Sequence, residues 1–117
     1  MKASRLLLLF LFAIALAPIN AQTISAPDAK NHVGEKATVC GKVAGERTAT
    51  GSKGEPTFVN LDASYPNQIF TILIWGEDRQ NAGDLPSEGS RICATGMIQQ
   101  YRGVPEIVVK SKTQLSQ

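Results

Sequence analysis

Apolar and polar side chains alternate along much of the chain after Gly34, and this alternation predicts short β-strands. In residues 35–46, Ala37, Val39 and Val43 share one parity, while polar residues and a cysteine occupy the other. A period of two with many β-branched residues is typical of strands. The same kind of segment recurs four times, so we expect five strands: 35–46, 57–62, 69–76, 91–101 and 104–111.

The segments between these strands contain turn-forming residues and no long amphipathic helix. Residues 47–56 are polar and rich in glycine, and residues 77–90 are irregular, so both predict loops. Residues 28–33 are expected to form one helical turn that Gly34 ends, and a second is expected at the start of the later loop. Residues 22–27 should form an extended tail. We therefore expect an all-β fold with at most one or two short helical turns.

The start of the chain has the pattern of a secretory signal peptide. Two basic residues precede an uncharged apolar run over residues 6–17, which is shorter than a typical membrane span. Ala21 then provides a small residue for cleavage. We expect residues 1–21 to be removed, which leaves residues 22–117 as one exported domain with no membrane segment, periplasmic or secreted. The alternative is a retained membrane anchor.

Removal of the signal would change the charge of the protein. The full chain has 12 Lys and Arg residues and 10 Asp and Glu residues. Lys2 and Arg5 lie in the signal, so 10 basic residues would face 10 acidic ones in a processed chain of about zero net charge. Nonspecific binding to nucleic acid depends on a basic surface. Any affinity for nucleic acid must therefore come from a local patch.

The chain has two cysteines, Cys40 and Cys93, and an even number in an exported protein predicts a disulfide. Each cysteine has the opposite parity to its apolar neighbours, so both should point away from the core of the first and fourth strands. A bridge between them is easiest if those strands are adjacent. A barrel closed in this way has the OB topology. The alternative is a reactive or metal-binding pair of thiols.

Three stretches of the sequence resemble small bacterial proteins with an OB fold. They are VGEKATVCGKV, TFVNLDASYPNQIFTILIWG and GSRICATGMIQQYRGVPEIVV. The resemblance covers about residues 28–115, and YRGVPEI at residues 101–107 is its most specific part. Such domains in anticodon-binding proteins and in nuclease subunits contact single-stranded nucleic acid. The resemblance therefore implies a five-stranded Greek-key OB barrel, preceded here by a cleaved signal peptide, and binding of single-stranded nucleic acid.

The residues that catalysis needs are sparse in this sequence. Nucleophilic catalysis usually uses a histidine as general base, and His32 is the only histidine. A secreted nuclease is the enzymatic alternative, but it would need several carboxylates for a metal, and Asp62 and Glu106 are isolated in the sequence. We therefore expect a protein that is not an enzyme and that needs no metal or cofactor.

The binding residues follow from the geometry that the OB fold implies. Ligands cross the second and third strands of such a barrel between two loops, which here are residues 46–55 and 99–105. Aromatic rings in these places stack on bases, and arginines pair with phosphates. The candidate ligand-binding residues are Arg47, Lys53, Phe58, Asn60, Tyr101 and Arg102.

A second interpretation belongs to a different functional class. The near-zero charge and the predicted export also fit a monomeric interaction protein that binds a peptide, a glycan or an envelope protein. Three acidic residues that flank the expected surface, Glu46, Glu55 and Asp62, would repel phosphate. The dependence of binding on salt distinguishes the two interpretations, because phosphate binding weakens steeply as salt is added.

Overall fold

A computed structural model describes residues 21–117, so all but the last residue of the predicted signal peptide lies outside the described residues. Within them no helix is long and apolar enough to cross a membrane. Three short 3₁₀ turns are present: η1 (Ala26–Asn31), η2 (Gly76–Asp78) and η3 (Lys112–Gln114). Eight strands make up most of the rest: β1 (Gln22–Ser25), β2 (Lys36–Thr48), β3 (Thr57–Leu61), β4 (Phe70–Ile74), β5 (Arg91–Met97), β6 (Gln99–Tyr101), β7 (Val104–Val108) and β8 (Leu115–Ser116).

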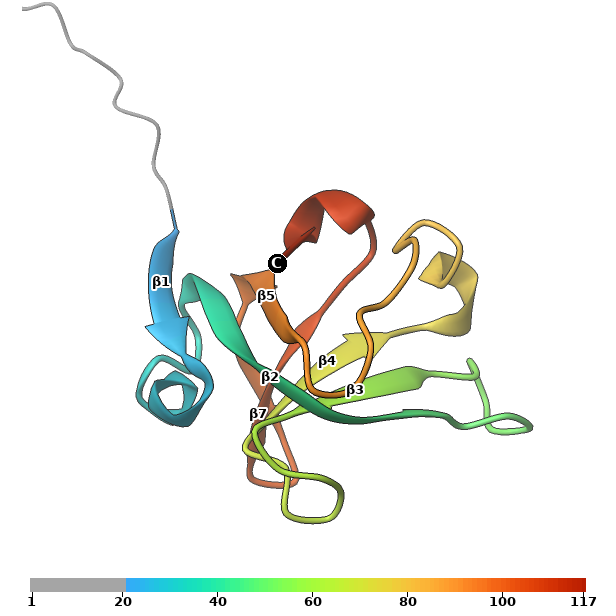
Figure 1. The fold of residues 1–117 in the computed structure, drawn as a ribbon, viewed down its shortest axis with the longest axis horizontal. Coiled ribbons are helices and arrows are strands. Elements are labelled where there is room, and N and C mark those ends of the chain that lie inside the picture. The colour runs from blue at the N-terminus through green and yellow to red at the C-terminus, as the bar shows by residue number, and fades with distance from the viewer. Residues whose placement is uncertain (1–20) are drawn as a thin grey trace, which may run out of the picture.

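The strands form one curled sheet with the order β6–β7–β4–β3–β2–β5–β8 (Figure 1). β2, β3 and β4 form an antiparallel meander, β7 joins β4 in parallel, and β5 joins β2 antiparallel. This order is OB-like, and the predicted pairing of the first and fourth long strands is confirmed as the β2–β5 ladder. The all-β prediction is confirmed as well, but the described residues form eight strands instead of the predicted five.

The expected strand over residues 91–101 is divided in two. β5 pairs with β2, whereas β6 pairs with β7, and only Ile98 separates them. The Ile98 N–H donates to the Glu35 carbonyl at 2.9 Å, and the Gly34 N–H donates to the Ile98 carbonyl at 2.8 Å. These bonds hold Ile98 against the segment leading into β2, so the strand changes partner here and connects the two sides of the curled sheet.

Further differences from the predicted fold concern the chain ends and the helical turns. Residues 22–25 are extended as expected and form β1, which pairs in parallel with β2, whereas Ala26 and Pro27 of the expected extended tail already belong to η1. The pairing satisfies backbone groups along an otherwise open edge of β2. β8 adds a short ladder to β5. The three 3₁₀ turns also exceed the predicted one or two.

The core lies inside the curled sheet and includes Ala37, Val39 and Val43, which share the predicted inner parity of the first long strand. Val39, Val59, Phe70 and Ile107 are each 0% exposed. η1 contributes Ala26 and Ala29 to the same cluster, so this turn covers part of the core as well as connecting β1 to β2. Burial of β-branched side chains on one face of each strand is the main force that holds the sheet in this register.

The predicted disulfide is present. Cys40 and Cys93 lie directly opposite each other in the β2–β5 ladder, off the inner parity, and their sulfur atoms are bonded. On the same face, the hydroxyls of Thr38 and Thr95 share a hydrogen bond of 2.7 Å. The first part of β2 is therefore joined to β5 by a covalent bond as well as by backbone hydrogen bonds.

Candidate functional site

A groove of about 410 Å³ lies on the outer face of the sheet. Its lining comes from β2, β3, β4, β6 and β7, from the loop between β2 and β3, and from the turn between β3 and β4. Outward side chains of antiparallel strands normally face water. Here the surrounding loops cover part of this face, so the groove has two walls and a floor.

Arg47, Phe58 and Tyr65 form the first wall. Arg47 and Phe58 are opposite each other in the β2–β3 ladder, which places their side chains on the same face. The guanidinium carbon of Arg47 is 5.3 Å from the centre of the Phe58 ring and 5.5 Å from the centre of the Tyr65 ring. Both distances are within the range of cation–π contacts. The wall therefore presents a positive charge next to two aromatic rings.

Tyr101 and Arg102 form the second wall, at the tip of the β6–β7 hairpin. The two central residues of its turn, Arg102 and Gly103, have φ angles of 50° and 80°. Positive φ at both positions is what a type I′ turn requires, and this turn follows the natural twist of a hairpin. The Arg102 guanidinium carbon is 5.2 Å from the centre of the Tyr101 ring. The turn thus holds a second arginine–aromatic pair, even though αL backbone is unfavourable for arginine.

A row of polar side chains forms the floor of the groove. Asn60 on β3, Thr71 on β4 and Glu106 on β7 are neighbours in consecutive ladders, and each is at most 6% exposed. Thr71 Oγ1 donates to Asn60 Oδ1 at 3.1 Å, and Gln99 Nε2 on β6 donates to Glu106 Oε1 at 2.7 Å. Gln68, from the preceding turn, also lines the groove. The floor is therefore buried, polar and partly hydrogen-bonded.

The groove brings together most of the ligand-binding residues that the sequence predicts. Arg47, Phe58, Asn60, Tyr101 and Arg102 all line it. Their role in binding stays a prediction.

Lys53 is the predicted residue that does not line the groove. The loop that carries it is fixed to the start of η2, since the Gly76 N–H donates to the Gly54 carbonyl at 2.8 Å. The Trp75 ring lies so close to Gly54 that an added Cβ there would be 2.9 Å from Trp75 Cε3. This contact fixes the tip of the loop next to β4 and η2.

Several lining residues were not predicted from the sequence. Thr71 and Glu106 have the outward parity of their strands, but they meet Asn60 only in the observed strand order. The outward parity of these two residues, combined with the OB strand order, would have identified both as neighbours of Asn60. Tyr65 and Gln68 lie in a turn, where no periodic pattern indicates which way a side chain points.

The acidic residues expected to flank the site do not line the groove itself. Glu46, Glu55 and Asp62 are not part of the lining. Asp62 has a structural contact instead, because its Oδ1 accepts the Lys42 N–H at 2.8 Å where the β2–β3 ladder ends. The one carboxylate in the groove is that of Glu106, on the floor.

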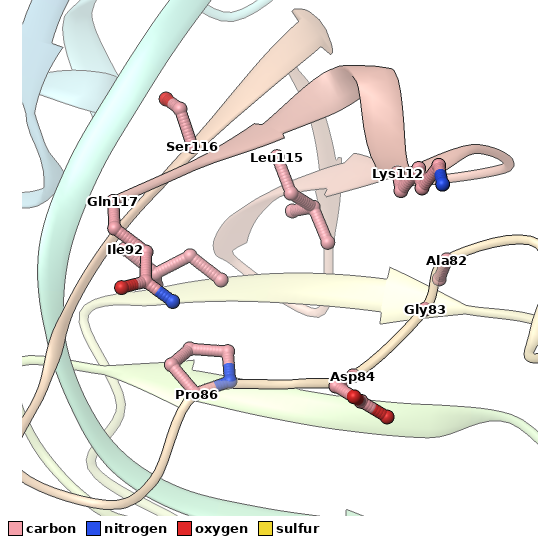
Figure 2. Close-up of a pocket in the computed structure, with 9 residues that line it drawn as sticks. All are labelled: Ala82, Gly83, Asp84, Pro86, Ile92, Lys112, Leu115, Ser116 and Gln117. Atoms are coloured by element: carbon pink, nitrogen blue, oxygen red, sulfur yellow. The ribbon is translucent and has the colours of Figure 1, made fainter.

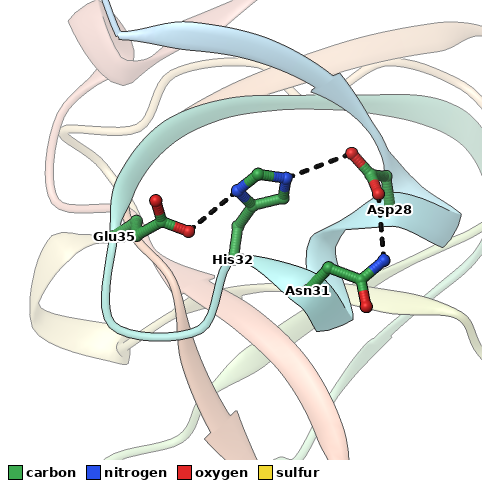
Figure 3. A network of polar contacts seen from close by, with 4 residues as sticks. All are labelled: Asp28, Asn31, His32 and Glu35. Atoms are coloured by element: carbon green, nitrogen blue, oxygen red, sulfur yellow. Dashed lines mark hydrogen bonds and ion pairs between the residues drawn. The ribbon is translucent and has the colours of Figure 1, made fainter.

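His32 belongs to a separate network on η1 (Figure 3). Its Nδ1 is 2.8 Å from Glu35 Oε2 and its Nε2 is 3.2 Å from Asp28 Oδ2. Asn31 Nδ2 donates to Asp28 Oδ1 at 3.0 Å, and this bond, together with His32, lowers the pKa of Asp28. The network connects η1 to the start of β2. In residues 21–117 no three or more His, Cys, Asp and Glu side chains are placed to hold a metal ion together.

A second, smaller pocket of about 210 Å³ lies between the η2–β5 connection and the C-terminal residues (Figure 2). Ile92 and Leu115 provide apolar surface, and Asp84 and Lys112 are the charged residues that line it. It shares no residue with the groove. Its lining holds no aromatic ring, so it offers less to a planar ligand than the groove does.

Comparison with known proteins supports the fold. No protein-family model and no curated protein sequence matches the chain. Among solved structures, a proposed aspartyl-tRNA synthetase from Leishmania major aligns over 88% of this chain with a TM-score of 0.52 and 13% identity. This chain covers only 22% of that synthetase, so the likeness concerns one region of a larger protein.

Another similar structure is a proposed nucleic acid-binding lipoprotein from Klebsiella pneumoniae. The alignment covers 71% of this chain and 73% of the other, with a TM-score of 0.50 and 17% identity. At such low identity the likeness establishes a shared fold and leaves the function to be argued from the groove.

Proposed function

We propose that this protein is an exported, non-enzymatic module that binds a short stretch of single-stranded nucleic acid in the groove. The observation that carries the proposal is the pair of arginine–aromatic walls, Arg47 with Phe58 and Tyr65 on one side and Tyr101 with Arg102 on the other. Proteins that bind single strands combine stacking rings with cations that follow the backbone. Both elements are present along one groove.

The rings and the arginines would contribute in different ways. Stacking of a base on an aromatic side chain contributes about 1–3 kcal/mol and tolerates any base. Tyr65 and Tyr101 are 65% and 57% exposed, so part of each side chain is open to a ligand even with an arginine over one face of its ring. The guanidinium groups can form bidentate bonds to phosphate oxygens. Two stacked bases with two paired phosphates would give measurable affinity without a basic protein surface.

Export is supported by independent observations. A disulfide between Cys40 and Cys93 is stable in an oxidising compartment. The structurally similar Klebsiella pneumoniae protein is described as a lipoprotein and as nucleic acid-binding, which agrees with both parts of the proposal. The predicted signal peptide gives the route by which this chain would leave the cytoplasm.

A second candidate function is binding of a glycan, a peptide or an envelope protein. The observation that favours it is the polar floor, because buried amide, hydroxyl and carboxylate groups also suit sugar hydroxyls. Such a ligand would not release counterions from a phosphate backbone, so its affinity would depend little on salt.

The salt dependence of binding tests the proposal. A labelled 12-nucleotide single strand would be titrated with the oxidised protein at several salt concentrations, with fluorescence anisotropy as the readout. Two arginine–phosphate contacts predict that log K falls with log salt with a slope of about −1.4. Binding with a slope near zero would favour the second candidate, and no binding at low salt would contradict the proposed function.

A further inference from the structure

The loop between β2 and β3 contributes one side of the groove, through Ala49, Ser52 and Pro56. Backbone hydrogen bonds close the base of this loop, where the Ala49 N–H donates to the Pro56 carbonyl at 2.9 Å. A polar, glycine-rich surface loop is ordinarily mobile unless other parts of the molecule hold it. The shape of the groove on this side therefore depends on what holds the loop.

The tip of the loop is held by Trp75 and Gly76, the two residues that follow β4. A Cβ added at Gly54 would be 2.9 Å from Trp75 Cε3 and 3.1 Å from Trp75 Cζ3, so the ring lies directly against this glycine. The Gly76 N–H donates to the Gly54 carbonyl at 2.8 Å, and a Cβ added at Gly76 would be 2.9 Å from the same oxygen. We call these contacts between Gly54, Trp75 and Gly76 the clasp.

The clasp surrounds backbone that is unfavourable by itself. Gly54 has a φ of 79°, and Glu55, the next residue, has a φ of 39°. Glycine adopts a positive φ freely, whereas a residue with a side chain does so at a cost. Such a residue keeps this conformation when its surroundings fix it, and positions of this kind are frequent at ligand-binding sites. Gly76 packs closely enough on Glu55 to help fix it, since an added Cβ would be 3.3 Å from the Glu55 carbonyl oxygen.

The position of Trp75 indicates that the ring acts through this loop. Its side chain is 38% exposed, and within residues 21–117 it belongs neither to the core cluster nor to the lining of the groove. The ring therefore does not fill the core and does not face a ligand in the groove. Its contact with Gly54 connects it to the loop that carries Ser52 and Pro56 into the lining.

We propose that Trp75 is a positioning residue for the groove, which holds residues 49–56 in place so that this side of the site is formed before a ligand arrives. A preformed loop binds more tightly than a mobile one, because no conformational entropy is lost in ordering it. This inference rests on the proposed function, since it takes a single strand as the ligand. It adds a residue outside the groove that controls affinity without touching the strand.

Two variants release the tip of the loop from different sides. Trp75→Ala removes the ring, and Gly76→Ala keeps the ring but places a Cβ against the Gly54 carbonyl. Each should weaken binding of a labelled 12-nucleotide strand of deoxycytidine about fivefold, because the strand must then order the loop. Trp75→Phe keeps a ring next to Gly54 and should restore the affinity to within about twofold. Thr50→Ala is the matched control, since Thr50 is an exposed residue of the same loop that does not line the groove, and its affinity should be unchanged.

Two measurements on the unmutated protein distinguish positioning from contact with the ligand. Trp75 is the only tryptophan of the chain, so intrinsic fluorescence reports on this ring, and it should change little when the strand binds. Without ligand, the Gly76 amide should exchange with deuterium at least about tenfold more slowly than an unstructured amide, because it donates to the Gly54 carbonyl. Both measurements stand even if a variant does not fold.

The outcomes separate the inference from the proposed function. Unchanged affinity of folded Trp75→Ala protein, or an equal loss in Thr50→Ala, would overturn the inference and leave the proposed function standing. Strong quenching of Trp75 by the bound strand, or unprotected exchange of the Gly76 amide, would also overturn the positioning role. If the unmutated protein binds no strand, the proposed function fails and the inference fails with it. The thermal unfolding midpoint of each variant is measured alongside, so that a loss of folded protein is not taken for a loss of affinity.

Discussion

The two halves of β2 serve different purposes. Its first half, residues 36–42, lies between β1 and β5 and carries Cys40, which is covalently joined to Cys93. Its second half, residues 43–48, pairs with β3 alone and carries Arg47 into the wall of the groove. The register shifts between Val43 and Gly45, at the point where one half meets the other. One strand thus fixes the barrel at one end and presents a candidate binding side chain at the other.

This difference shows why a small barrel can keep an exposed site. A protein of this size buries limited apolar surface, so its core alone gives modest stability. The disulfide and the additional β1 ladder strengthen the first half without touching the groove. The second half is then free to carry Arg47, a candidate ligand-binding residue, into the groove. Changes in the first half should affect unfolding, and changes in the second half should affect binding.

Removal of the disulfide should have the largest effect. The bond closes a loop with a sequence separation of 53 residues, and the Cys40→Ala/Cys93→Ala double variant should lower the free energy of unfolding by about 4 kcal/mol. Urea denaturation measures this loss. The affinity of the remaining folded protein for a single strand should be unchanged. A loss of stability below about 1 kcal/mol would show that the cross-link does not stabilise the first half as described.

Two glycines of β2 provide the next comparison. A Cβ at Gly41 would be 2.9 Å from Asp62 Oδ1 and 3.1 Å from Leu61 Cβ, whereas a Cβ at Gly45 would meet nothing within 4 Å. Gly41→Ala should therefore cost about 1–3 kcal/mol by overpacking. Gly45→Ala is the matched control and should change stability by less than about 0.5 kcal/mol. Equal melting temperatures for the two variants would contradict the difference in packing between the halves.

Tyr101→Ala tests the second wall of the groove. Tyr101 is 57% exposed, so removal of its ring should change the free energy of unfolding by less than about 1 kcal/mol. Loss of one stacked base should weaken binding of a single strand by about 1–3 kcal/mol. Anisotropy titration and thermal unfolding measure the two effects separately. A large loss of stability with unchanged affinity would mean that Tyr101 supports the hairpin instead of a ligand.

The smallest expected effect concerns acid and the network around Asp28. The pKa of Asp28 is lowered in the folded protein, chiefly by the hydrogen bond from Asn31. A lowered folded pKa contributes stability above the unfolded value of about 3.9, and this contribution is lost as the pH falls through the folded pKa. Asp28→Asn should therefore lower the stability slightly at neutral pH and flatten the stability curve below about pH 4. An unchanged slope in acid would show that the network contributes nothing measurable.

The strands and the core could be predicted from the sequence because they follow from periodicity. Val39, Val59 and Ile107 have the inner parity, and all are buried. The position of the disulfide followed from the same parity argument. What periodicity does not reveal is a change of partner along one strand, since the bend at Ile98 depends on two backbone hydrogen bonds to residues far away in sequence.

The candidate site could be predicted in most of its walls but, in its floor, only at Asn60. Arg47, Phe58, Tyr101 and Arg102 are conspicuous in sequence because arginines and rings lie at the ends of expected strands. Glu106 appeared as an isolated carboxylate, because its neighbours Asn60 and Thr71 lie on other strands. A row of polar side chains that crosses several strands of a sheet can be identified only once the strand order and register are known. Residues of the β3–β4 turn have no periodic signal at all.

The most direct test of the account locates the ligand on the molecule. Backbone amide NMR shifts would be recorded as an unlabelled 12-nucleotide strand of deoxycytidine is added to the oxidised protein. The account predicts that perturbed amides cluster around Arg47, Phe58, Tyr101 and Glu106, while β1 and the half of β2 next to the disulfide stay unchanged. Perturbations centred on β1 and β5, or no perturbation at all, would contradict the assignment of binding to the groove.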